Sequence, residues 1–510
     1  MKRSRIGIIS TIIIVVEAVI IGALTMIRTR YVIEIFGTNI NGVVQLANQL
    51  TAYMLLFESG MTAAYQYNMY KPLINKDTTR ISQLYLGMKH DFRIIAAKMA
   101  GCALIIAFLF SFVLMNRGVT YSTSVALLCV MGLRLVAPYI FTVPLRTLII
   151  VKEKKYVTDI IETIKNSVSL LIEIFLIIRT TLPLFLILSI FVLFTFLTSF
   201  VYKIMVKRYF DDPFDKNNEE DRSPRQMTKD ILVHRIAGLI NSNTDSVLLS
   251  FVKDLGLNSV TIYTSFSTII NYPITLASRI IDSMRASVAL KVTEDNDSAY
   301  DCYRELIAFS KVCVLIVFPV YVAVSNDFIT LWIGEKYQIS SLNTILFGLT
   351  CIHQMMIPSV YATRDAFGLY KESKMYSLAQ ALVNMVVSIV LIKPFGITGV
   401  LIGTVVSDWF IIEPLNIRLV FKNIFKKKFD MLFDYLGLFT IMGLSGYLCT
   451  YVRRMTLETG FGWQEFIVTI IIVGVVSTFV AVLYLMASDK GFRRLIKRFL
   501  PKSIGVRNQL

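Results

Sequence analysis

The chain has 510 residues, of which 55% are hydrophobic and 17% are charged, and its formal net charge is +17. Soluble proteins are typically about 45–50% apolar, so this composition argues against an ordinary soluble protein. Apolar runs of about 18 or more residues recur to the end of the chain, which predicts an all-α polytopic membrane protein. Most of the 52 Lys and Arg residues lie in short loops between these runs, as orientation signals do, so we expect no nucleic-acid partner.

The N-terminal segment MKRSR precedes the first apolar span, residues 7–27. This span is too long for the core of a signal peptide, and no small-residue cleavage site follows it, so we expect a membrane helix. With MKRSR in the cytoplasm, alternate loops carry the basic residues, and both termini are predicted to be cytoplasmic. The sequence predicts fourteen spans in all: 7–27, 42–65, 94–115, 121–143, 157–178, 183–205, 231–251, 259–284, 305–325, 342–362, 375–393, 397–417, 432–452 and 465–487.

The longest polar stretch, Lys207–Lys229, is charged and contains two prolines. It predicts a cytoplasmic linker, 207–229, between an N-terminal six-helix bundle, 1–206, and a C-terminal six-helix bundle, 230–421. Residues 422–510 are predicted to add two helices and a basic cytoplasmic tail.

The segment Met227–Lys291 keeps polar and charged residues within two apolar spans. Such residues are expensive inside a bilayer, at about 2.5–3.5 kcal/mol for a central charge, and they normally face a bundle interior or a watery cavity. The pair is therefore predicted to line a polar pathway. The residues concerned are His234, Arg235, Asn241, Asn243, Asp245, Arg279 and Asp282.

Four arginines are candidates for a substrate cavity that holds a pyrophosphate and sugar: Arg28, Arg134, Arg235 and Arg279. Arginine suits phosphate because its planar fork makes bidentate, charge-assisted hydrogen bonds and keeps its proton. Arg134 and Arg279 are expected to face the bundle interior, either contacting substrate or held in ion pairs. For Arg28 and Arg235, which lie near span ends, anchoring at the membrane interface is an equal alternative.

The buried carboxylates Glu17, Glu58 and Asp245 are candidates for ion coupling. Glu17 lies in the middle of IIIVVEAVIIGAL, where it is either a proton or cation site or the partner of a buried arginine. For His353, a hydrogen bond between helices is favoured over a role as a proton relay.

Catalytic and metal motifs are not evident in this sequence. The six cysteines form no CxxC pattern, and neither HExxH nor GxSxG occurs. The prediction is therefore a protein that is not an enzyme, with no catalytic residues, no metal and no cofactor. Gly396, Gly399 and Gly403 in GITGVLIGT indicate close helix packing rather than a phosphate-binding loop.

Several stretches resemble bacterial polysaccharide flippases, the Wzx-type exporters of O-antigen and capsule repeat units. Their order and spacing match that family over most of residues 30–410. The stretches are FESGMTAAYQYNMYKPLINKDTTRISQLYLGMKHDFRIIA (Phe57–Ala96), INSNTDSVLLSFVKDLGLNSVTIYTSF (Ile240–Phe266), NDFITLWIGEKY (Asn326–Tyr337) and FGITGVLIGTVVS (Phe395–Ser407).

The resemblance implies the MATE-like fold of the multidrug/oligosaccharidyl-lipid/polysaccharide exporter superfamily, with two six-helix bundles and extra C-terminal helices. It also implies a flippase for an undecaprenyl-diphosphate-linked oligosaccharide in cell-surface polysaccharide biosynthesis, working by alternating access in the bacterial inner membrane. A polysaccharide polymerase and other assembly proteins are candidate partners. The alternative is a cation-coupled drug or metabolite exporter of the same fold, which would need an acidic cavity instead of a cationic one.

Overall fold

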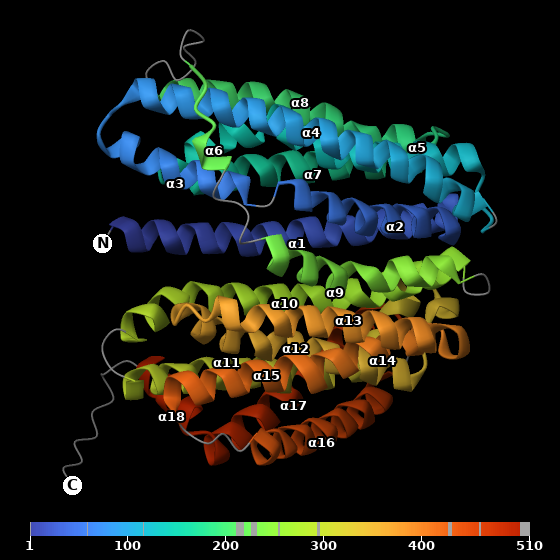
Figure 1. The fold of residues 1–510 in the computed structure, drawn as a ribbon. Coiled ribbons are helices and arrows are strands. Elements are labelled where there is room, and N and C mark those ends of the chain that lie inside the picture. The colour runs from blue at the N-terminus through green and yellow to red at the C-terminus, as the bar shows by residue number, and fades with distance from the viewer. Residues whose placement is uncertain are drawn as a thin grey trace. The chain divides into compact units, whose positions relative to one another are not determined.

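The computed structural model describes residues 2–58, 60–115, 117–210, 219–225, 232–252, 256–292, 296–426, 431–457 and 461–499. Throughout these ranges the chain is helical, with short turns and no strands (Figure 1). Its contacts define two compact units, Met1–Thr264 and Ser265–Leu510. The prediction of an all-α polytopic membrane protein is confirmed, since each of the fourteen predicted spans coincides with one α-helix or with two successive α-helices and the turn between them.

The N-terminal unit is built from long apolar helices with shorter ones at their ends. Three helix starts have clear local causes: Gly60 is left-handed before α3, Thr120 caps α5 through the amide of Thr123, and Pro183 precedes α8. The helices are α1 (Lys2–Phe36), α2 (Thr38–Met54), α3 (Met61–Ile74), α4 (Thr78–Met115), α5 (Tyr121–Phe141), α6 (Val143–Val151), α7 (Lys155–Arg179), α8 (Leu184–Tyr209) and α9 (Leu232–Phe251).

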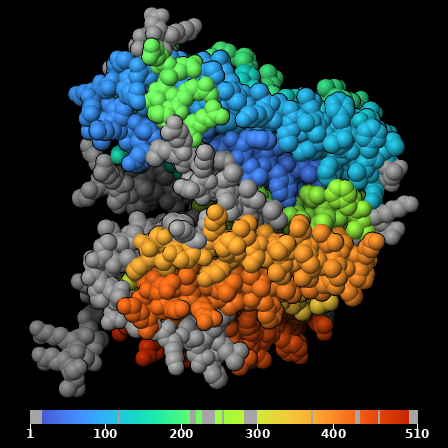
Figure 2. All heavy atoms as spheres, viewed as in Figure 1, coloured from blue at the N-terminus to red at the C-terminus, as the bar shows by residue number. Residues whose placement is uncertain are grey.

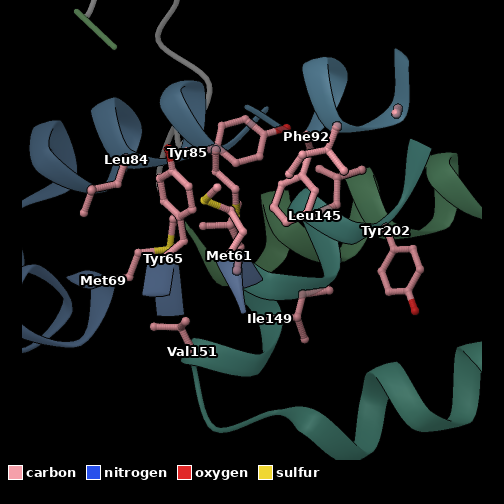
Figure 3. Packing of buried hydrophobic residues seen from close by; sticks show 14 of the residues in the cluster. Met61, Tyr65, Met69, Leu84, Tyr85, Phe92, Leu145, Ile149, Val151 and Tyr202 are labelled. Atoms are coloured by element: carbon pink, nitrogen blue, oxygen red, sulfur yellow. The ribbon is translucent and has the colours of Figure 1, made fainter. Parts of the chain in front are cut away.

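The core of this unit lies where α3, α4, α6 and α8 meet. Tyr65, Phe92 and Tyr202 are fully buried there. Figure 3 shows side chains of α3, α4 and α6 facing one another in this cluster. The packing orders the first half of α4, which is too polar to be held by the bilayer alone.

Helix α9 and the first residues of α10 also belong to the N-terminal unit. Thr244 of α9 shares a hydrogen bond of 2.9 Å with Tyr53 of α2, and Asn41 donates to Thr261 at 3.1 Å. Arg117 donates to the carbonyl of Val252 at the end of α9. The functional division at residues 207–229 remains a prediction.

A short part of the predicted linker, Glu219–Arg225, lies on α4 (Figure 2). The amide of Asp221 donates to the carbonyl of Gln83, and Arg222 binds the buried Asp91 through two nitrogens at 2.8 and 2.6 Å. A Cβ at Gly87 would come closer than 3.0 Å to the Asp221 carbonyl, so only glycine permits this approach. The segment is therefore docked through both backbone and side-chain contacts.

Docking of this segment also changes the pKa of one of its own carboxyl groups, that of Asp221. Partial burial acts to raise the pKa of Asp221, but hydrogen bonds from Ser223 and the nearby charge of Arg80 outweigh it. The pKa of the Asp221 carboxyl therefore lies below its ordinary value.

The C-terminal unit contains the rest of α10 and the helices that follow it. One continuous helical stretch, Ile397–Phe425, contains two π-helical turns, η4 (Asp408–Ile412) and η5 (Phe421–Phe425). Its helices are α10 (Gly256–Val292), α11 (Asn296–Trp332), α12 (Ser341–Ala366), α13 (Tyr370–Phe395), α14 (Ile397–Ser407), α15 (Glu413–Val420), α16 (Met431–Leu457), α17 (Trp463–Ser488) and α18 (Lys490–Phe499).

The glycines of GITGVLIGT lie where α13 and α14 pack closely. A Cβ at Gly399 would come closer than 3.0 Å to the carbonyl of Leu391, and one at Gly403 would do the same with the Ser388 hydroxyl. Gly396 has a φ of 56° and turns the chain between the two helices. These contacts agree with the predicted role in helix packing.

Nine segments are long and apolar enough to cross a membrane, counted by length and composition over the described residues. The candidate site described below is built from charged and polar groups on α1, α5, α7 and α8.

Candidate functional site

Two predicted arginines of the N-terminal unit converge on one buried carboxylate. Arg28 of α1 binds Glu173 of α7 at 2.8 Å, and Arg134 of α5 binds the other oxygen of Glu173 at 2.6 Å. Glu173 is 0% exposed. The two side chains of the arginines are 11% and 14% exposed, so the whole group is nearly excluded from solvent. We call Arg28, Arg134 and Glu173 the arginine cluster.

Further contacts orient the cluster from α8. Arg134 also donates to the carbonyl of Leu188 at 2.7 Å, and its guanidinium carbon lies 4.6 Å from the ring centre of Phe191. Lys165 of α7 lies 4.6 Å from the same ring centre, while it pairs with Glu162 at 2.6 Å. One aromatic ring thus contacts two cations, which favours retention of positive charge at this place.

The arginine cluster has more positive charge than its carboxylate neutralises. Every hydrogen bond that Arg28 and Arg134 make to described residues uses Nη1. Nε and Nη2 of both guanidinium groups make no hydrogen bond to the described residues. A phosphate or pyrophosphate would receive charge-assisted hydrogen bonds from such a pair in a weakly hydrated environment.

The other two predicted arginines, Arg235 and Arg279, remain predictions. Arg279 lies on α10 in the C-terminal unit, and its side chain is exposed. Arg235 lies on α9, but its side chain is outside the described part of the structure, as are those of His234, Asn241 and Asp282.

Two of the predicted ion-coupling carboxylates have local structural partners. Glu58 is 7% exposed and accepts hydrogen bonds from the amides of Thr62 and Gly60 at the start of α3. Asp245 is 3% exposed and accepts from the Tyr263 hydroxyl at 2.7 Å. Glu17 lies half-buried on α1. Glu17 lies on α1, Glu58 in the turn before α3, and Asp245 on α9.

The C-terminal unit contains a second buried polar group, centred on His353 of α12. Its Nδ1 lies 3.0 Å from Glu413, and its Nε2 lies 3.9 Å from Asp408. The Tyr435 hydroxyl donates to Glu413 at 2.5 Å, and Gln380 donates to Asp408 at 2.7 Å. We call these five residues the histidine cluster. An imidazole beside two carboxylates can take up a proton and hold it as an ion pair.

The histidine cluster depends on a local departure from α-helical geometry. Asp408 and Glu413 are five residues apart, and in a regular α-helix such residues point in different directions. The π-helical turn Asp408–Ile412 widens the helix between them, so that both carboxylates reach one histidine. The pattern of charged residues in the sequence carries no signal for a π-helical turn, and the grouping was missed for that reason.

These features define the class: a polytopic α-helical membrane protein with charged clusters buried inside its helix bundles. Its fold is that of the MATE-like exporters. The chain is similar to the structure of the lipid II flippase MurJ in an inward closed conformation, with a TM-score of 0.64 and 14% identity, over 94% of this chain and 99% of that one.

Two structures of a multidrug resistance MATE family transporter of the MOP superfamily are also similar. The inward-facing one has a TM-score of 0.58 at 11% identity, covering 78% of this chain and 94% of that one. The outward-facing one has a TM-score of 0.56 at 12% identity, covering 82% and 97%. No family model matches the chain, and no curated protein matches its sequence.

Proposed function

We propose that the protein flips an undecaprenyl-diphosphate-linked oligosaccharide across the bacterial inner membrane during cell-surface polysaccharide biosynthesis. The observation that carries the proposal is the arginine cluster, where Arg28 and Arg134 share the single carboxylate of Glu173. A net positive charge with guanidinium donors to spare suits a pyrophosphate. The likeness to a lipid II flippase supports a lipid-linked substrate for this fold.

The sign of the buried charge separates this function from the alternative of a cation-coupled drug or metabolite exporter. An exporter of small cations needs an acidic cavity, because cationic substrates would be repelled by two arginines that share one carboxylate. The arginine cluster therefore favours an anionic headgroup. Alternating access would let that headgroup pass through the protein while its lipid tail stays in the bilayer.

Energy coupling is part of the same proposal. Glu17, Glu58 and Asp245 remain our candidates for ion coupling, and both termini are proposed to be cytoplasmic. A polymerase and other assembly proteins are proposed to receive the flipped repeat unit.

The test is glycan export in a bacterial host that depends on this chain for its surface polysaccharide. Arg28→Gln and Arg134→Gln are compared with Arg30→Gln, which changes an exposed arginine two residues away on α1. At equal protein abundance, we expect the first two variants to lose surface glycan and to accumulate the lipid-linked intermediate on the inner leaflet, while Arg30→Gln exports normally. Normal export by all three variants, together with efflux of cationic drugs, would support the alternative.

A further inference from the structure

A cavity of about 400 Å³ lies between the first half of α4 and the last turns of α8. Three lysines line it: Lys89 from α4, and Lys203 and Lys207 from α8. The two lysines of α8 are four residues apart and therefore lie on one face of the helix. Positive charge from two helices thus converges on one hollow.

The remaining lining is apolar or aromatic: Tyr85, Leu86, Phe200 and Ile204. Phe200 and Ile204 are 47% and 63% exposed, and they lie on the same stretch of α8 as the lysines. Large apolar side chains with this exposure on a membrane helix face lipid. The Nζ of Lys203 lies 5.0 Å from the ring centre of Phe200, so the charged and apolar parts of the cavity are continuous.

The cavity is placed where a membrane surface is expected. Helix α8 is apolar for most of its length and becomes basic only at Lys203, Lys207 and Arg208. Helix α4 has the opposite order, with a charged first half and an apolar second half. The two changes of polarity meet at the cavity, so its lysines lie at headgroup level and its apolar wall faces the acyl chains.

Two simpler roles for the lysines are each incomplete. Cations near the C-terminus of α8 complement the helix dipole, and basic residues at span ends set orientation. Neither role requires a hollow with an apolar wall beside the lysines of α8. A soluble anion would use the charge but leave the apolar wall without a partner. An amphiphile with an anionic head satisfies both parts.

We propose that this cavity binds an anionic glycerophospholipid, with the headgroup phosphate among Lys89, Lys203 and Lys207 and an acyl chain along Phe200 and Ile204. The site is separate from the arginine cluster, since no residue is shared between them. The lipid would act as a resident ligand of the N-terminal unit, and its binding does not depend on the transported substrate.

The experiment is lipid binding to the purified full chain by native mass spectrometry. Phosphatidylglycerol and phosphatidylcholine with identical acyl chains are compared on the parent protein and on Lys203→Gln/Lys207→Gln. The charge-matched control is Lys155→Gln/Lys490→Gln, which removes two exposed lysines outside the cavity. We expect the cavity variant to lose affinity for phosphatidylglycerol by about tenfold or more, and the control variant by less than about twofold.

Three results would overturn the proposal: equal binding of the two lipids by the parent, equal loss in the two double variants, or full competition by inorganic phosphate alone. The last result would make the cavity a site for free anions. If the cavity variant does not fold, Leu86→Trp, which fills the hollow and leaves every lysine in place, should show the same loss. Undiminished phosphatidylglycerol binding by that variant would also overturn the proposal.

Discussion

Replacing Glu173 with Gln is the most informative change in the arginine cluster. Glu173 is 0% exposed and joins α7 to α1 and α5, so its removal leaves two nearly buried guanidinium groups without their counter-charge. Breaking a buried ion pair from one side costs about 3–5 kcal/mol. At roughly 2 °C per kcal/mol for a unit of this size, the melting temperature should fall by about 6–10 °C.

The assay is thermal unfolding of the purified protein in one detergent, followed by the loss of the monodisperse peak. A double variant, Glu173→Gln/Arg134→Gln, removes one arginine together with the carboxylate. The net charge of the cluster is then the same as in the parent, so the melting temperature should recover part of the loss. We therefore expect the order parent, then double variant, then Glu173→Gln. Together with Arg134→Gln measured alone, the recovery gives the coupling between the two residues independently of their separate effects.

A melting temperature for Glu173→Gln within about 1 °C of the parent would refute the reasoning. It would mean that water or lipid headgroups screen the arginines, and that the carboxylate does not hold the three helices together. A double variant that is less stable than either single variant would refute the charge-balance argument in particular.

Three further changes test other parts of the structure. Gly87→Ala should push Glu219–Arg225 off α4 and speed proteolysis there several-fold, whereas Gly101→Ala, a change on the same helix with open space around its Cβ, should not; equal rates would contradict the close approach. Glu413→Ala removes the acceptor of Tyr435 and the partner of His353, and should cost about 1–3 kcal/mol in a thermal melt. Glu413→Gln should cost less, and equal losses would exclude a role for the acceptor. The pKa of Asp221 is lowered on folding, so its contribution to docking is present above its unfolded value of about 4 and is lost as the pH falls through the lower folded value. An acid protease should therefore cleave the segment faster as the pH falls below about 4, with Asp221→Asn showing no such step. An equal step in Asp221→Asn would contradict this role of the Asp221 carboxyl.

The helices could be predicted from the sequence because a bilayer imposes a length. Each span must be apolar over the hydrocarbon thickness and must make its backbone hydrogen bonds within itself. Apolar runs such as those of α8 and α17 can therefore be predicted as helices without any knowledge of packing. The helix-packing role of the glycines in GITGVLIGT could also be predicted, since only a residue without a side chain allows α13 and α14 to approach each other closely. Arginines were also recognisable as unusual in apolar surroundings.

The ion-pair partners of the buried arginines could not be predicted from the sequence, because they depend on how the helices rotate and pack. Arg28 and Glu173 are 145 residues apart, and Arg134 and Glu173 are 39 apart, and no periodicity links them. The histidine cluster depends on the π-helical turn between Asp408 and Glu413, and the sequence pattern does not predict such a turn. By itself, then, the sequence determined the all-helical class and the apolar character of the spans, because the membrane acts on each segment locally. The tertiary structure decided which buried charges meet, because a buried charge is stable only beside a partner that another helix brings to it.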